Sequence, residues 1–262
     1  MHPHFAASQR APAPLAAPRA ARFTAVIAAR RTRVGKTLLA RVLCDYLLLS
    51  GRDPDIFDTD AAERKLAGFF PRRSAVIDLD RVTDQMRLFD SLAAARKDAH
   101  VVDLAQKASS KFFELMRETD YLAEAAAREA KTVVFYVPDG SKASYEEARE
   151  LRESFSQCPL VVVKNELLGQ ASAAARRGAD YRSMTGLLQA VTMPHLDPAC
   201  ADMIEEPGWS FSAFMRRPLS LAESAPAQEA ASLLAARAAI RAWTLAMFQE
   251  IHRVTRMLHV RA

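Results

Sequence analysis

A short run near the N-terminus combines the residue types that bind phosphate. Residues 25–43 read AVIAARRTRVGKTLLARVL, so Gly35-Lys36-Thr37 stands between an apolar run and a helix-like segment. Backbone N–H groups at a helix N-terminus attract anions, a lysine reaches terminal phosphates, and a hydroxyl can bind Mg²⁺. Gly-Lys-Ser/Thr arises by chance in roughly one chain of this length in ten. Because the strand-then-helix setting lowers that frequency further, the run predicts a phosphate-binding loop.

The loop departs from the usual G-x-x-x-x-G-K-[ST] pattern. Arg30 stands where the first glycine is expected, and a glycine there allows a tight turn that a side chain obstructs. Two outcomes therefore stay open from the sequence: a loop that still binds and turns over nucleotide, and a loop that no longer does either.

The elements around this loop alternate between short apolar runs and helical stretches. Such alternation predicts a three-layer αβα fold, in which helices cover both faces of a mostly parallel sheet. Ligands of such sheets bind at the carboxyl ends of the strands, where the loop lies. The runs predicted as strands are Phe23–Ala28, Asp55–Phe57, Ala75–Leu79, His100–Val102, Thr132–Val137, Leu160–Val163 and Ala190–Met193.

Two helices have recognisable sequence signals. Residues 36–51 read KTLLARVLCDYLLLSG; Leu39, Leu43 and Leu47 share one helical face, and Gly51 predicts the C-terminal stop. A second helix is predicted from Ser144, which stands three residues before Glu147 as in a capping box.

A single long helix is predicted from about residue 227 to the C-terminus. Its apolar residues recur at steps of three and four and predict a helix packed on the domain; they are Ile240, Trp243, Met247, Ile251, Val254 and Leu258. A partner-binding helix and a basic amphipathic helix on a membrane surface remain alternatives.

Length and composition indicate the domain organisation and the distribution of charge. The chain has 262 residues, half of them apolar, which suits one α/β domain over residues 22–262. Residues 1–21 are rich in Ala and Pro and predict a disordered basic arm, with a targeting peptide as the rival interpretation. The net charge of +5 is local, because residues 1–40 hold seven basic residues and no acid. Basicity is therefore not a global nucleic-acid signature.

The cysteines and the hydropathy pattern bear on the compartment. Cys44, Cys158 and Cys200 are far apart and form no CxxC pair, which favours a reducing cytoplasm over a disulfide or zinc framework. No run of eighteen apolar residues occurs, so we expect no transmembrane segment and a cytoplasmic protein.

Aligned on Lys36, residues 31–37 read R-T-R-V-G-K-T. This resembles the deviant loop K-G-G-x-G-K-[ST] of the ParA/MinD/nitrogenase-iron-protein branch of P-loop ATPases. The resemblance places Arg31 where the family has a lysine that crosses a dimer interface to the partner's nucleotide. Arginine keeps that charge and can bind phosphate bidentately. The loop residues expected around the nucleotide are Arg33, Val34, Gly35, Lys36, Thr37 and Leu38.

Three further segments resemble this family in the same order. DIFDTDAAERKLAGFF places Asp60, two residues after Asp58, near the attacking water. AHVVDLAQKASSKFF ends its strand at Asp103, the position linked to magnesium. PLVVVKNE places Asn165 at the adenine, and the loop around Pro194 would close over the base.

Within the branch, residues 23–217 are most similar to the ParA-like proteins of plasmid conjugal-transfer and mobilisation operons. The resemblance implies a dimerising switch that binds ATP and Mg²⁺, hydrolyses ATP slowly, and controls an unidentified protein partner or cargo. A degenerate scaffold and a small-molecule kinase or ligase are the alternatives. Non-specific DNA contact would use the basic N-terminal arm and arginine pairs on the surface, namely Arg72, Arg73, Arg176, Arg177, Arg216 and Arg217.

Overall fold

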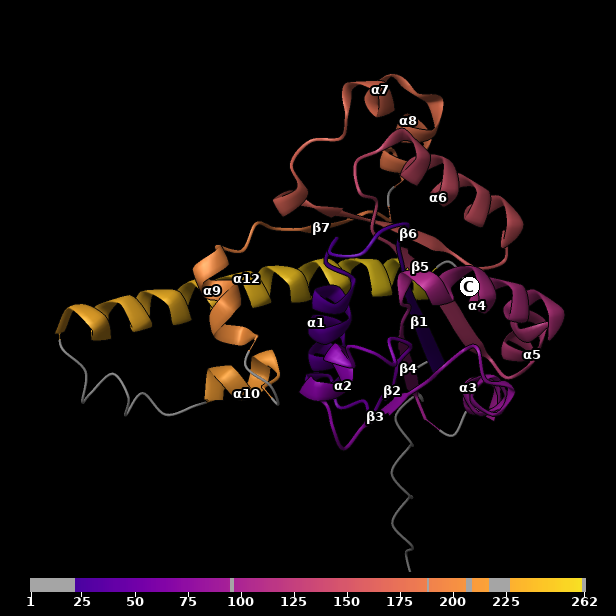
Figure 1. Cartoon of the computed structure of the whole chain (residues 1–262), viewed down its shortest axis with the longest axis horizontal. Coiled ribbons are helices and arrows are strands. Elements are labelled where there is room, and N and C mark those ends of the chain that lie inside the picture. Colours follow the sequence, from indigo (N-terminus) through magenta and orange to yellow (C-terminus); the bar gives the residue numbers. More distant parts are fainter. Residues whose placement is uncertain (1–21, 95–96, 188, 206–208, 217–226, 261–262) are drawn as a thin grey trace, which may run out of the picture.

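Seven parallel strands form one sheet in the order β3-β2-β4-β1-β5-β6-β7 (Figure 1). The structure, a computed structural model, describes residues 22–94, 97–187, 189–205, 209–216 and 227–260. The predicted arm and Arg217 lie outside these ranges. The strands are β1 Arg22–Ala28, β2 Asp55–Asp58, β3 Ser74–Val76, β4 Ala99–Asp103, β5 Ala130–Tyr136, β6 Leu160–Asn165 and β7 Val191–Met193.

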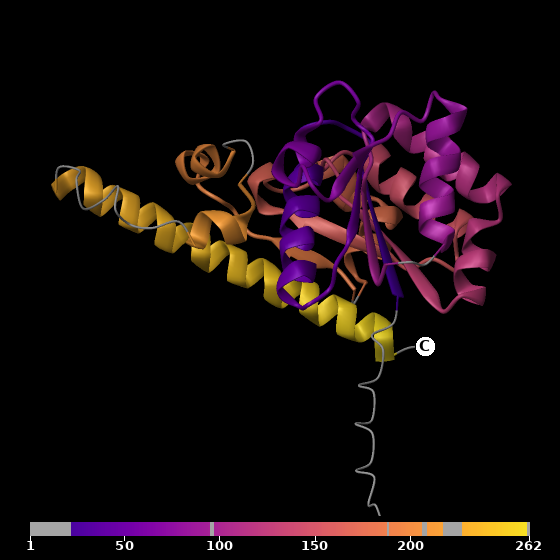
Figure 2. The ribbon, with the colours of Figure 1, turned by 90° about the horizontal axis from the view of Figure 1, so that it is seen from below.

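Helices cover both faces of this sheet (Figure 2), which confirms the predicted three-layer α/β class. One face carries α1 Lys36–Leu49, α2 Lys65–Phe69, α9 Pro198–Ile204, α10 Phe211–Arg216 and α12 Ala227–Val260. The other carries α3 Val82–Ala94, α4 Gln106–Glu118, α5 Tyr121–Ala127, α6 Lys142–Ser154, α7 Ala173–Arg177 and α8 Ala179–Thr185. A 3₁₀ turn, η1 Glu166–Leu168, follows β6.

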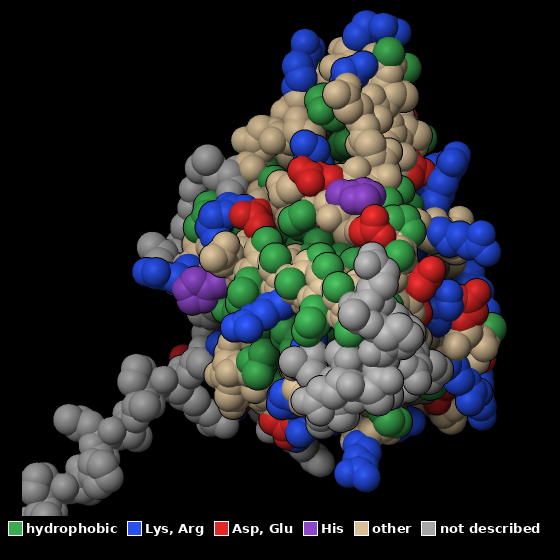
Figure 3. Space-filling view, turned by 90° about the vertical axis from the view of Figure 1, so that its left-hand side faces the viewer, with side chains coloured by type: hydrophobic (Ala, Val, Ile, Leu, Met, Phe, Trp, Pro, Cys, Tyr) green, Lys and Arg blue, Asp and Glu red, His purple; other side chains and the backbone are tan. Residues whose placement is uncertain are grey.

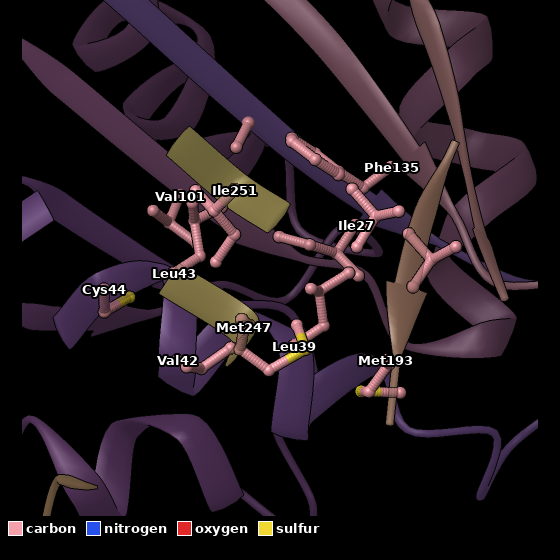
Figure 4. Close-up of a cluster of buried hydrophobic side chains, with 14 of the residues drawn as sticks. Ile27, Leu39, Val42, Leu43, Cys44, Val101, Phe135, Met193, Met247 and Ile251 are labelled. Atoms are coloured by element: carbon pink, nitrogen blue, oxygen red, sulfur yellow. The ribbon is translucent and has the colours of Figure 1, made fainter. Parts of the chain in front are cut away.

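The core has two halves because successive residues of a strand point to opposite faces. In β1, Phe23, Ala25 and Ile27 belong to the cluster under α1 and α12. Val26 and Ala28 belong to the cluster on the other face. Figure 4 shows side chains of α1, α12 and the strands meeting in the first cluster. The sheet is thus buried on both sides, and its strand ends are left to form a site.

The predicted apolar face of α1 is confirmed, since Leu39, Leu43 and Leu47 are all buried. The helix ends at Leu49, and Gly51 adopts a left-handed φ of 78° just beyond it. Two local predictions were wrong. Strand β3 ends at Val76 instead of Leu79. Helix α6 is capped by Ser141, whose side chain accepts a hydrogen bond from the Ser144 amide, so Ser144 lies inside the first turn.

The C-terminal helix α12 is 34 residues long and runs along the α1 side of the sheet (Figure 2). The six residues of its predicted apolar stripe are all buried, so its C-terminal part packs on the core as expected. By length and composition alone, the stretch Ala230–Leu258 could also cross a membrane. One such helix is weak evidence, and the absence of a transmembrane segment stays a prediction.

A buried histidine in β4 makes stability depend on pH. Burial lowers the pKa of His100 to about 4, whereas an unfolded histidine titrates near 6.5. The unfolded chain therefore binds more protons than the folded chain between these values, and stability falls as the pH drops from about 6.5 to 4. We expect a loss of up to about 3 kcal/mol from this group.

The measurement is urea unfolding at several pH values for the wild type and His100→Gln. The variant should lose that part of the pH dependence, while His195→Gln, which changes an exposed histidine, should keep it. Identical pH profiles for the wild type and His100→Gln would contradict the assignment.

Candidate functional site

The predicted loop connects the C-terminal end of β1, the central strand, to the first turn of α1. Gly35 has a φ of 97°, and no side chain caps the helix that starts at Lys36. The first N–H groups of α1 therefore have no partner within the helix and face the loop. Arg33 also has a positive φ, 58°, a conformation that costs roughly 1–2 kcal/mol for a residue with a side chain. The chain thus makes a tight strand-to-helix turn that places a side chain, that of Arg33, at a left-handed φ.

Lys36 folds back over this loop. Its Nζ donates a hydrogen bond of 3.1 Å to the Arg31 carbonyl oxygen, and the residue is only 8% exposed. Burial lowers the pKa of Lys36, while the charges of Asp103 and Asp60 oppose that shift. The ammonium group is therefore placed within the loop and close to acidic side chains.

Thr37 and Asp103 meet at the junction of α1 and β4. The Thr37 hydroxyl donates to Asp103 Oδ2 at 2.7 Å. Asp103 Oδ1 is buried and accepts no hydrogen bond from the described residues. Burial is the main cause that raises the pKa of Asp103 to about 7; the charges of Asp58 and Asp60 act in the same direction, and the Thr37 hydrogen bond and the Lys36 charge oppose them. A buried, unpartnered carboxylate oxygen beside a hydroxyl suits a hard cation, which prefers oxygen ligands.

The two aspartates after β2 have different surroundings. Asp58 is 2% exposed and accepts hydrogen bonds from the Asp60 and Ala67 amides, both at 3.0 Å, so it holds the turn and α2 in place. Asp60 is half-buried; its Oδ1 accepts from the Ala62 and Glu63 amides. Among the described residues no hydrogen bond to Asp60 Oδ2 occurs.

A cleft of about 600 Å³ joins these groups. Eight of the eleven residues predicted from the sequence line it, namely Arg33, Gly35, Lys36, Thr37, Leu38, Asp60, Asp103 and Asn165. Val34, also in the loop, is only 4% exposed and does not line the cleft. Pro194 does not line the cleft; its carbonyl oxygen accepts a hydrogen bond of 2.9 Å from Trp243 Nε1 of α12.

Arg31 lies outside this cleft. Its Nε is 3.0 Å from Asp139 Oδ2, and Arg30 Nη1 is 3.2 Å from Glu147 Oε2. Both arginines line a second cleft of about 750 Å³ between α4 and α6. Arg30 and Arg31 are thus each paired with a carboxylate of the same chain.

Sequence reasoning missed several residues that shape the cleft. Arg41 and Glu205 line it, with Arg41 Nη1 3.7 Å from Glu205 Oε1. Arg41 lies one helical turn after Thr37, which lines the cleft, yet its side chain is only 1% exposed. A charged residue within the mostly apolar segment LLARVLCDYLLL was a usable signal, because buried charges need dedicated partners.

Comparisons with known proteins do not assign a function to this chain, so the argument for one rests on the residues of the cleft. No model of a protein family matches the chain, and no curated protein matches its sequence. Several solved structures are similar to the chain at low identity. The MinC:MinD cell division protein complex of Aquifex aeolicus is 16% identical, with 83% of this chain and 93% of that chain covered and a TM-score of 0.44.

Two other solved structures show how broad the similarity is. McdA of Cyanothece, in complex with ATP, is 13% identical over 74% of this chain and 91% of that chain, with a TM-score of 0.41. Signal recognition particle 54 kDa protein of Aeropyrum pernix, in complex with GDP, is 16% identical over 68% and 42%, with a TM-score of 0.42. Similarities of this size assign neither a family nor an activity.

Proposed function

We propose that this chain is a nucleotide-binding switch of the ParA/MinD type, which binds ATP with Mg²⁺, dimerises in that state and hydrolyses ATP slowly if at all. The observation that carries the proposal is the bond between Thr37 and the buried Asp103, beside Lys36 in an uncapped loop-to-helix turn. This combination of a helix N-terminus, a lysine, a hydroxyl and a carboxylate is what phosphoryl transfer requires.

Each residue has a defined role in this proposal. Lys36 binds the terminal phosphates, and the amides of the loop and first turn of α1 bind the phosphate oxygens. Thr37 and Asp103 hold Mg²⁺, which fits the unpartnered Asp103 Oδ1. The metal, when bound, neutralises phosphate charge. Asp60 orients the attacking water through Oδ2. Arg33, Val34 and Leu38 belong to the loop and first turn around the phosphates, and Asn165 lies against that loop. Pro194 lies outside the lining of the cleft.

Arg31 has a conditional role in the dimer. To reach a nucleotide across a dimer interface, it must exchange its ion pair with Asp139 for one with phosphate. This exchange would make dimerisation dependent on nucleotide, because the phosphate offers the arginine a bidentate partner that replaces the Asp139 carboxylate.

The biological setting proposed is partition, positioning or plasmid transfer in the cytoplasm, with an unidentified protein partner or cargo. Non-specific DNA contact would use the exposed arginines at 72, 73, 176, 177 and 216. Figure 3 shows Lys and Arg side chains scattered around hydrophobic ones on the side of α9, α10 and the start of α12. Such binding is sequence-independent and weakens steeply with added salt.

A specific observation favours a second candidate, a scaffold that binds partners without hydrolysing nucleotide. Arg33 keeps a side chain at a left-handed φ, and Arg30 and Arg31 are both paired within the chain. In this candidate the loop is stable but carries out no turnover, and partner binding does not depend on Lys36.

Lys36→Ala separates these candidates. We expect it to weaken ATP–Mg²⁺ binding about 10- to 100-fold, because it removes a charged hydrogen bond to phosphate. Calorimetry measures binding, and size-exclusion chromatography with light scattering, with and without ATP–Mg²⁺, measures dimerisation. Lys142→Ala removes an equal charge from the surface of α6, away from the lining of the cleft, and should change neither. Equal ATP binding by the wild type and Lys36→Ala would exclude the switch; no binding at millimolar ATP would favour the scaffold.

A further inference from the structure

Asn165 is the polar residue that ends β6, and its side chain lies beneath the phosphate loop. It is 6% exposed. Its Nδ2 donates to the Val34 carbonyl oxygen at 2.9 Å, and its Oδ1 accepts from the Leu167 amide at 3.0 Å. Both polar atoms of the side chain are therefore engaged by backbone groups, one in the loop and one in η1.

The contact with the loop is close. A Cβ atom placed on Gly35 would lie 2.8 Å from Asn165 Nδ2 and 2.8 Å from Met193 Cε. The ends of β6 and β7 thus support the loop from below, at the point where Gly35 adopts its left-handed φ. A strained loop conformation persists only when its surroundings fix it, and Arg33 adds such strain two residues earlier.

The hydrogen bond to Val34 also sets the direction of an anion-binding group. In a trans peptide the carbonyl and the following N–H point in opposite directions. Because the Val34 carbonyl is turned toward Asn165, the Gly35 N–H is turned away from β6, and Gly35 lines the candidate cleft. By binding the Val34 carbonyl, the Asn165 side chain therefore fixes the direction of the Gly35 N–H, which can donate to an anion in the cleft.

We propose that Asn165 is a positioning residue that holds the phosphate loop in its anion-binding shape, and that it does not read the base. The proposal rests on the proposed function, since it concerns the same cleft. It explains how a loop with arginines and a threonine at glycine positions keeps its shape: the fold supplies from β6 the constraint that the loop sequence lacks.

Tripolyphosphate separates the two roles because it has phosphates and no base. Calorimetry with ATP, GTP and tripolyphosphate, each with Mg²⁺, is run on the wild type and Asn165→Ala. Loss of one orienting hydrogen bond should weaken all three ligands about ten-fold and leave the ratio of ATP to GTP affinity unchanged. Unchanged tripolyphosphate binding together with an altered ATP to GTP ratio would overturn the proposal.

A second measurement needs no variant. Asn165 is the single asparagine of the chain, so selective ¹⁵N-asparagine labelling gives one side-chain amide signal. Tripolyphosphate and ATP should shift that signal equally, and adenosine should leave it in place. A shift with adenosine that tripolyphosphate does not produce would assign the residue to the base.

The same signal distinguishes failure of this proposal from failure of the proposed function. If the wild type binds none of the three ligands, and Lys36→Ala behaves identically, the nucleotide site itself is absent. Even then, exchange of the Asn165 side-chain amide in the free protein should be at least ten-fold slower than in an unstructured peptide. Unprotected exchange would show that Asn165 does not hold the loop.

Discussion

Arg41→Ala is expected to lower the free energy of unfolding by about 3–5 kcal/mol, the range for breaking a buried charged network by removing one partner. The Arg41 guanidinium lies 3.6 Å from the centroid of the Phe69 ring and 4.8 Å from that of Phe211. It donates hydrogen bonds to the carbonyl oxygens of Ile204 and, at 2.9 Å, Trp209. The side chain therefore joins α1 to α2, α9 and α10.

The buried carboxyl group of Asp45 adds to the loss of stability expected for Arg41→Ala. Asp45, one turn further along α1, is fully buried and accepts hydrogen bonds of 2.7 Å from the Phe211 amide and the Ser212 hydroxyl. Burial raises the pKa of Asp45, and Arg41 is a positive charge close to it. Without Arg41 this carboxyl group keeps its hydrogen bonds and loses its nearby charge, while two carbonyl groups lose their donor.

Chemical denaturation of the wild type, Arg41→Ala and Arg152→Ala measures this effect. Arg152 is an exposed arginine of α6, so its removal should change the free energy of unfolding by less than about 0.5 kcal/mol. A loss below 1 kcal/mol for Arg41→Ala would mean that the guanidinium contacts carry little of the link between α1 and the α9–α10 region.

Gly35→Ala is expected to destabilise the fold by about 2–5 kcal/mol and to weaken nucleotide binding. A side chain at a φ of 97° costs roughly 1–2 kcal/mol, and crowding in a packed region adds about 1–3 kcal/mol. The crowding arises because the new Cβ would lie 2.8 Å from both Asn165 Nδ2 and Met193 Cε, and Met193 is fully buried. The loop must move away from the strand ends, which displaces its anion-binding amides.

Gly51→Ala provides a matched control, because Gly51 also has a positive φ, 78°, but a Cβ there would meet nothing within 4 Å. It should cost only the conformational part, about 1–2 kcal/mol, and leave nucleotide binding unchanged. The difference between the two variants isolates the contact between the loop and the ends of β6 and β7. Equal losses for both would show that this contact does not constrain the loop.

The sequence predicted which residues follow each strand and meet at the site, because that prediction depends only on local patterns. Each strand is a short apolar run, and each polar residue that follows such a run falls at the carboxyl edge of a parallel sheet. Lys36, Asp60 and Asp103 could therefore be placed at one edge before the fold was known, and they line one cleft. The face of α1 followed equally from the spacing of its leucines.

Tertiary structure decided which partner each polar side chain meets. The carboxylate for Arg31 comes from Asp139, 108 residues along the chain, and the groups around Arg41 come from α2, α9 and α10. Neither pairing leaves a periodic signal, because it depends on how distant segments pack. The start of α6 shows the same limit at short range: Ser141 and Ser144 are both acceptable caps by type, and the path of the chain from β5 selected Ser141.

The sequence by itself determined the α/β class, the strand order along the chain and the residues available for phosphate binding, since burial patterns and residue types are local properties. Only the tertiary structure decided that the asparagine ending β6 lies under the loop and that a buried arginine links α1 to the α9–α10 region. The physical reason is that a hydrogen bond or ion pair needs two groups at a defined distance, and that distance exists only once the sheet has brought the strand ends together.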